Sequence, residues 1–193
     1  MVIDDLPCVI FAGGRSSRMV EDKSLLPFAN FPTLTEFQLK KYQKIFKNVY
    51  ISTKDSSKFS FDAEFIEDIK SDIFAPSVAF LSIFKTLKCE RFFAISVDTP
   101  FVKTQTIKKL IELDSSSKFA TIVKSAYALE PLCGIYHKSL VERFEDMLKT
   151  NNHKLNHMLK SVDIKTLEVF DEDEFLNLNH PHEYQKALTL LNL

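Results

Sequence analysis

Short apolar runs alternate with amphipathic stretches along the chain. Residues 6–12 and 92–97 are apolar runs of the kind that form buried strands, and the second is typical of a central strand covered on both faces. Further strands are expected at 49–51, 64–66, 121–123, 132–136 and 164–169. Helical patterns are expected at 35–45, 76–87, 104–113, 140–148, 153–160 and 181–191.

Local signals mark the starts of three of these helices. Thr35 and Thr104 are the expected N-caps, and Pro76 suits the first helical position. The alternation of strands and helices predicts an α/β fold, in which a mostly parallel, Rossmann-like sheet is covered by helices on both faces. Because the chain shows no repeat and no long linker, residues 1–193 are expected to form a single domain. Ligands of such sheets bind beyond the carboxyl ends of the strands.

The composition narrows the function classes. Hydrophobic residues make up 45% and charged residues 26% of the 193 residues, as in globular proteins. A net charge of −1 predicts no broad attraction to nucleic acid or membrane, and no apolar run reaches the ~18–20 residues that span a bilayer. The chain starts without a secretion-signal pattern, and its three cysteines include no close pair. We therefore expect a reduced, cytoplasmic protein.

Glycine is scarce, and its placement is informative. A chain of this length would ordinarily contain roughly thirteen glycines, but this one has three, and two of them, Gly13 and Gly14, directly follow the first predicted strand. The same loop contains the cations Arg15, Arg18 and Lys23. Glycines allow backbone N–H groups to approach a triphosphate closely, and cations balance its charge. The loop thus favours phosphate binding over an ordinary solvated turn, although it matches neither the Walker loop nor the dinucleotide fingerprint.

Two carboxylates follow predicted strands. Asp98 ends the apolar run 92–97, and Pro100 keeps the residue before it extended, so Asp98 is expected to leave the sheet edge in a fixed direction. A carboxylate there can bind Mg²⁺ at a triphosphate, or it can serve only as a turn or cap residue. Asp68 follows the strand at 64–66 and is either a nucleotide contact or an exposed loop carboxylate.

These segments resemble one family in order along nearly the whole chain. Residues 11–23 are similar to the N-terminal signature of the molybdenum cofactor guanylyltransferases, Leu-Ala-Gly-Gly-x-Ser-x-Arg-Met-Gly-x-Asp-Lys, except at Phe11 and Val20. Residues 96–102 resemble the Cys-Asp-x-Pro-Phe-Val segment of that family. Residues 130–136 resemble its Pro-Leu-x-Gly-Ile-Tyr strand, and residues 177–183 its closing Asn-x-Asn-Thr-Pro element.

The resemblance implies a Mg²⁺-dependent nucleotidyltransferase. It would transfer GMP from GTP to molybdopterin, release pyrophosphate and form a guanine dinucleotide cofactor, with other molybdenum cofactor biosynthesis proteins as candidate partners. The catalytic residues carried over are Lys23, Asp98 and Arg18, with Asp98 as the metal ligand. The nucleotide-binding residues carried over are Phe11, Ala12, Gly13, Gly14, Lys23, Asp68 and Asp98. In this arrangement the backbone of residues 11–13 faces the guanine.

Three departures from the family pattern keep alternatives open. Val20 and Ala75 stand where the family has glycine, and residues 52–54 replace an Asn-x-Asn segment near the base. A related transferase for another donor or acceptor, such as a cytidylyltransferase or a sugar-phosphate enzyme, is the first alternative. A nucleotide-binding partner protein without turnover is the second.

One further pattern, a histidine pair, indicates function less specifically than the motifs above. His153 and His157 have the four-residue spacing of helical metal ligands, but without a third ligand a surface pair is favoured. They lie in the lysine-bearing segment 149–160, which in similar enzymes is an acceptor-binding region and is otherwise a solvated helix end.

Overall fold

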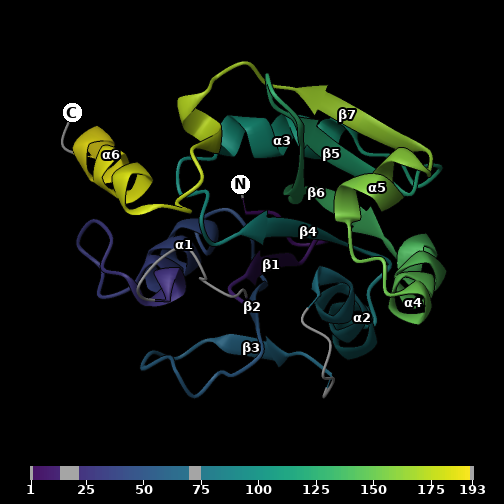
Figure 1. The fold of residues 1–193 in the computed structure, drawn as a ribbon, viewed down its shortest axis with the longest axis horizontal. Helices are drawn as coiled ribbons and strands as arrows, with labels where there is room; N and C mark the ends of the chain where they lie inside the picture. Colours follow the sequence, from purple (N-terminus) through teal and green to yellow (C-terminus); the bar gives the residue numbers. More distant parts are fainter. Residues whose placement is uncertain (1, 14–21, 70–74, 192–193) are drawn as a thin grey trace.

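A seven-stranded mixed sheet forms the centre of the protein (Figure 1). The structure, a computed structural model, describes residues 2–13, 22–69 and 75–191. The strands are β1 (Cys8–Phe11), β2 (Val49–Thr53), β3 (Glu64–Glu67), β4 (Arg91–Ser96), β5 (Ala120–Lys124), β6 (Leu129–His137) and β7 (Ile164–Glu168). The helices are α1 (Leu34–Tyr42), α2 (Pro76–Leu87), α3 (Thr104–Leu113), α4 (Val141–Thr150), α5 (Leu155–Lys160) and α6 (Pro181–Leu191). Short 3-10 helices are η1 (Lys23–Leu25), η2 (Lys138–Leu140) and η3 (Asp173–Phe175).

The strand order is β3-β2-β1-β4-β6-β5-β7, and only β6 runs antiparallel to its neighbours among these strands. The predicted α/β class with a mostly parallel sheet is confirmed. Because β1, β2, β3 and β4 are parallel, their carboxyl ends meet at one edge, and the loops after them lie beside one another. This edge carries the functional residues described below.

Two apolar clusters cover the two faces of the sheet, because side chains alternate along each strand. Cys8 and Ile10 of β1 pack in the cluster that contains α1, α3 and α6, whereas Val9 and Phe11 pack in the cluster of α2, α4 and α5. Residues 92–95 of β4 alternate between the same two clusters and are all fully buried. The prediction of a central strand covered on both faces is confirmed.

The first predicted cap is wrong. Helix α1 begins at Leu34, and its N-cap is Thr33, whose hydroxyl accepts a hydrogen bond from the Glu36 N–H at 3.1 Å. Thr35 is fully buried, and its hydroxyl donates to the Ser24 carbonyl at 2.7 Å. Thr33 and Thr35 are two residues apart and are equivalent as local cap signals. Thr33 is the cap because the hydroxyl of Thr35 is engaged by the Ser24 carbonyl.

The second predicted cap is also wrong, although α3 begins at Thr104 as predicted. Its N-cap residue is Lys103, whose side chain makes no capping hydrogen bond. The Lys103 N–H instead donates to the buried carboxylate of Glu174 at 2.9 Å. A side chain 71 residues away therefore satisfies the start of this helix.

The helix predicted at 153–160 is shorter than expected. Helix α4 ends at Thr150, and Asn151 adopts a left-handed backbone with φ 53°. Asparagine tolerates this conformation at a helix end. The turn that follows carries the chain to the start of α5 at Leu155.

No helix in the described ranges is both long and apolar enough to cross a membrane. The three cysteines are free, and Cys8 and Cys133 are buried in the core as expected.

Candidate active site

A cavity of about 460 Å³ opens at the edge where the parallel strands end. It is lined by the loops after β1, β2, β3 and β4, by the first turn of α2 and by Leu132 of β6. The predicted site residues that it brings together are Phe11, Ala12, Gly13, Lys23, Asp68 and Asp98. Gly14 and Arg18 lie outside the described residues, as does Val20.

The loop after β1 runs close to the end of β2. The Ala12 N–H donates to the Ser52 carbonyl at 2.8 Å, which extends the pairing of the two strands by one residue. A Cβ atom on Gly13 would lie 3.4 Å from Thr53 Cα and 3.5 Å from the Lys54 nitrogen. These contacts are close to ordinary ones, so packing within the protein does not demand glycine here. The exposed side of Gly13 is the side on which a ligand can approach the backbone.

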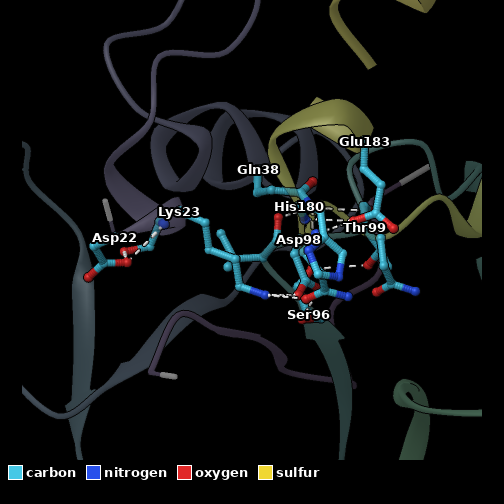
Figure 2. Close-up of polar contacts among 12 residues, drawn as sticks. Asp22, Lys23, Gln38, Ser96, Asp98, Thr99, His180 and Glu183 are labelled. Atoms are coloured by element: carbon cyan, nitrogen blue, oxygen red, sulfur yellow. Dashed lines mark hydrogen bonds and ion pairs between the residues drawn. The ribbon is translucent and has the colours of Figure 1, made fainter. Parts of the chain in front are cut away.

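Lys23 and Asp98 meet directly at the cavity. The Lys23 ammonium donates to the Asp98 carboxylate and, at 2.8 Å, to the Asn179 side-chain oxygen (Figure 2). The second Asp98 oxygen accepts a hydrogen bond from the Ser96 hydroxyl at 2.5 Å. The Lys23 and Asp98 side chains are 18% and 10% exposed, so solvent screens this ion pair less than it screens a surface pair.

The closing segment 177–183 reaches the same place. The Leu178 N–H donates to the Asp98 carbonyl at 2.9 Å. The Glu183 carboxylate accepts hydrogen bonds from the N–H groups of Asn179 and His180, each at 2.7 Å. Glu183 thus binds the backbone of the turn before α6, from which the Asn179 side chain reaches Lys23.

Sequence reasoning missed Lys58, which joins three parts of the cavity wall. Its ammonium donates to the Asp22 carboxylate at 2.8 Å, the Ser24 hydroxyl at 3.0 Å and the Ala12 carbonyl at 3.3 Å. Burial alone would raise the pKa of Asp22, but hydrogen bonds from Lys58 and Ser24 outweigh it, and that pKa is lowered. Lys58 follows a polar loop 36 residues from Asp22, and no local pattern distinguishes it from a solvated lysine.

Asp68 lies at the end of β3 and has an unsatisfied acceptor. Its N–H donates to the Thr53 carbonyl at 3.0 Å, while its buried Oδ1 has no hydrogen-bond partner among the described residues. Burial raises the pKa of the Asp68 carboxyl to about 6, although the nearby Lys54 ammonium opposes the shift. A buried acceptor of this kind at a cavity wall is suited to an N–H or O–H donor of a ligand.

Ala75 is compatible with its position, although the family pattern has glycine there. It is the N-cap of α2 with φ −140°, an extended backbone that any residue adopts, and Pro76 follows at the first helical position. The start of α2 at Ala75 and Pro76 therefore forms without glycine.

The histidine pair and the lysine-bearing segment lie beside this site. His153 contacts the Ser77 hydroxyl of α2 at 3.3 Å, whereas His157 is exposed. The residues that the structure describes contain no group of three or more side chains placed to hold a metal ion. A smaller cavity of about 140 Å³ between α4 and α5 is lined by residues that include Arg143, Lys154 and His157.

Comparison with known proteins finds similarity to one family. Residues 8–166 match the family described as the MobA-like NTP transferase domain. A molybdenum cofactor guanylyltransferase of Campylobacter jejuni is 39% identical over 187 residues, which cover 96% of this chain and 97% of the relative. A molybdenum cofactor guanylyltransferase of Helicobacter pylori is 33% identical over 195 residues, covering 98% and 95%.

The fold is also found in a solved structure. The molybdopterin-guanine dinucleotide biosynthesis protein A of Archaeoglobus fulgidus superposes with a TM-score of 0.81 at 22% identity, covering 97% of this chain and 99% of that one. At this identity, the similarity bears on the fold alone.

Proposed function

Because the chain belongs to the MobA-like NTP transferase family, we propose that it is a molybdenum cofactor guanylyltransferase that transfers GMP from GTP to molybdopterin. The observation that carries the proposal is the Lys23–Asp98 pair at the cavity next to the exposed Gly13 backbone. In this proposal residues 1–193 act as one nucleotidyltransferase domain.

The transfer needs no covalent intermediate on the protein. A phosphate oxygen of the acceptor attacks the α-phosphorus of GTP, a new P–O bond forms, and the bond to the departing pyrophosphate breaks. The charge that develops on the phosphate oxygens is stabilised by the Lys23 ammonium and by backbone N–H groups at Gly13, with Gly14 and Arg18 proposed for the same task. The rate gain comes from positioning and electrostatics.

Asp98 is the proposed ligand for Mg²⁺. The structure fits this role because one Asp98 oxygen already faces a cation, the Lys23 ammonium, while Ser96 holds the other oxygen. Mg²⁺ is usually bound in proteins through one or two carboxylates together with substrate phosphates. When bound, it would supply charge neutralisation at the phosphates. Asp98 would hold the metal, and the Lys23 ammonium would supply a second positive charge beside it.

The base is proposed to lie against the backbone of residues 11–13, with Asp68 at the nucleotide. The Asp68 carboxylate offers an acceptor that matches the N–H groups of guanine or the hydroxyls of ribose. Lys54, in the segment 52–54 that differs from the family pattern, lines the same cavity.

The acceptor is proposed to bind toward the segment 149–160. The contact between His153 and Ser77 places this segment beside the first turn of α2, which borders the main cavity. The side chains of Arg143 and Lys154 in the smaller cavity carry the positive charge that a phosphorylated acceptor needs.

Calorimetric titration with GTP, CTP, ATP and UTP in Mg²⁺, followed by assay of pyrophosphate release with molybdopterin, tests the proposed function. We expect GTP to bind at least about tenfold more tightly than the other triphosphates, and only GTP to support transfer. Selectivity for CTP would retain the transferase class and change the donor. Binding without transfer to molybdopterin would overturn the proposed acceptor, and absence of turnover with any pair would overturn the enzyme assignment.

Asp68 is expected to make GTP binding depend on pH. Its pKa is about 6, and the charged form is the acceptor, so affinity should rise as the pH increases through 6. Protonation of Asp68 should weaken GTP binding about tenfold at pH 5 relative to pH 7. The Asp68→Asn variant should lack this pH dependence. The triphosphate itself also titrates, but its contribution is the same for both proteins. Calorimetry of the two proteins at several pH values measures the difference.

Protein stability provides the control for this variant. The folded pKa of Asp68 lies above its value in the unfolded chain, so its charged form destabilises the fold, increasingly as the pH rises from about 4 to about 6. Asp68→Asn should therefore not lower the melting temperature at pH 7. A lower melting temperature, or the same pH dependence in both proteins, would contradict this role.

A further inference from the structure

We propose that Gln38 and Lys41, both on α1, are positioning residues that hold the backbone around Asp98 and thereby control the rate of transfer. The inference rests on the proposed function and assigns to that reaction two residues that lie behind the cavity wall. Neither residue lines the cavity.

Gln38 binds the backbone on both sides of Asp98. Its side-chain nitrogen lies 3.3 Å from the Ser96 carbonyl oxygen, 3.2 Å from that of Val97 and 3.2 Å from that of Thr99. An amide nitrogen has two hydrogens, so three carbonyls share two donors. Figure 2 shows the Gln38 side chain directed from α1 toward the segment that carries Asp98 and Thr99.

Lys41 continues the same contact further along the segment. Its ammonium donates to the Pro100 carbonyl at 2.7 Å and to the Val102 carbonyl at 2.6 Å. Gln38 and Lys41 are three residues apart on α1, which places both on the face that packs against residues 96–102. The carbonyl of Asp98 itself accepts from Leu178 on the other side. The backbone is therefore held both before and after Asp98, which leaves the carboxylate directed at Lys23.

These two side chains are costly to bury. Gln38 is fully buried, and its side-chain oxygen has no hydrogen-bond partner among the described residues. Burial lowers the pKa of Lys41 to about 8, although the neighbouring Cys133 and Glu174 oppose the shift. Burying an unpaired amide oxygen or an ammonium opposes folding. An apolar side chain of similar size would avoid both costs, but it would leave the carbonyls of residues 96–102 without these donors.

The contacts have a consequence for the chemistry. A ligand to Mg²⁺ and a partner of Lys23 must hold its oxygens within a fraction of an ångström, and a misplacement of about 1 Å can cost about 10²-fold in rate. Losing the donors from α1 frees the segment on which Asp98 sits without removing any group that contacts GTP. The turnover number should therefore fall while GTP binding is retained.

Five variants test this inference. Gln38→Met and Lys41→Met remove the donors at similar size, and Lys41→Arg restores donors. Gln43→Met and Lys40→Met are the controls, because both residues are exposed on the same helix or at its end. Each protein is assayed for kcat, KM for GTP, GTP affinity by calorimetry, and affinity for Mn²⁺ by water-proton relaxation, which requires no turnover.

We expect kcat to fall about 10–100-fold in the two methionine variants, with KM and the Kd for GTP changed less than about threefold. Affinity for Mn²⁺ should fall about tenfold, Lys41→Arg should recover most of kcat, and the controls should match the native protein. Equal kcat in test and control variants would overturn the inference. So would a fall in kcat matched by a loss of GTP-binding stoichiometry, because that indicates unfolding alone. If the methionine variants do not fold, Lys41→Gln, which retains a donor, is compared with Lys41→Arg, and equal kcat and Mn²⁺ affinity in both and in the native protein would overturn the role of Lys41.

The outcomes distinguish a failure of the proposed function from a failure of the role assigned to α1. A native protein without GMP transfer would overturn the proposed function, whereas the Mn²⁺ measurements would still decide whether α1 positions Asp98.

Discussion

Asp98→Asn is expected to lower the rate of GMP transfer by about 10²–10³-fold, the usual loss when a group that stabilises transition-state charge is removed. Asparagine has nearly the shape of aspartate and can still accept a hydrogen bond from Ser96, so the fold should persist. It lacks the negative charge that attracts Mg²⁺ and pairs with Lys23. Half-maximal turnover should consequently require a higher Mg²⁺ concentration, while GTP binding changes little.

Steady-state rates measured over a range of Mg²⁺ concentrations check this result. Asp163→Asn is the matched control, since Asp163 is 64% exposed in its pair with Lys118, far from the cavity residues in the sequence and not among them. A rate within about tenfold of the native protein would exclude Asp98 as the essential carboxylate. The melting temperature of each variant shows whether a lost rate reflects lost structure.

Lys23→Ala is expected to reduce both binding and turnover. The Lys23 ammonium lies at the cavity between Asp98 and Asn179, where it can move onto a triphosphate when one enters. Its removal should weaken GTP binding at least about tenfold and lower kcat by about 10²-fold, because it acts on phosphate charge in the ground state and in the transition state. A loss of both GTP affinity and kcat distinguishes Lys23 from Asp98, because the Asp98 variant should lose mainly kcat.

Calorimetry and steady-state kinetics on the same preparations measure the two effects. Lys109→Ala is the control, because Lys109 is exposed on α3 and takes no part in the cavity. Unchanged GTP affinity in Lys23→Ala would show that the lysine does not bind the triphosphate. Lys23→Arg separates charge from shape, since an arginine keeps the charge but distributes it over a larger planar group.

The sequence by itself determined the class of fold and the centre of the site. Apolar runs and helical periodicity depend on neighbours in the chain, so β4 and α2 could be predicted close to their observed ends. Asp98 and Gly13 could be placed at the edge of the sheet because each directly follows a strand, and parallel strands bring their carboxyl ends together. The family resemblance then connected these positions to one reaction.

Local sequence signals were insufficient to predict the N-caps of α1 and α3. In each case a contact with a residue distant in the sequence accompanies the observed cap. Thr33 rather than Thr35 caps α1, because the Ser24 carbonyl takes the hydroxyl of Thr35. Lys103 rather than Thr104 is the N-cap residue of α3, and its N–H donates to the Glu174 carboxylate of η3. Neither contact leaves a pattern in the residues around the helix start.

Only the tertiary structure decided which further polar side chains, beyond those predicted from the sequence, support the site. Lys58 lies 36 residues from Asp22, and Gln38 lies about sixty from the carbonyls it binds, so chain neighbours give no indication of either contact. Gln38 and Lys41 read along the helix as ordinary polar positions, and their burial follows from the packing of α1 against residues 96–102. Such hydrogen bonds form between residues that the fold brings together, so they depend on the tertiary structure. The helices and strands that carry these residues depend mainly on neighbouring residues in the chain.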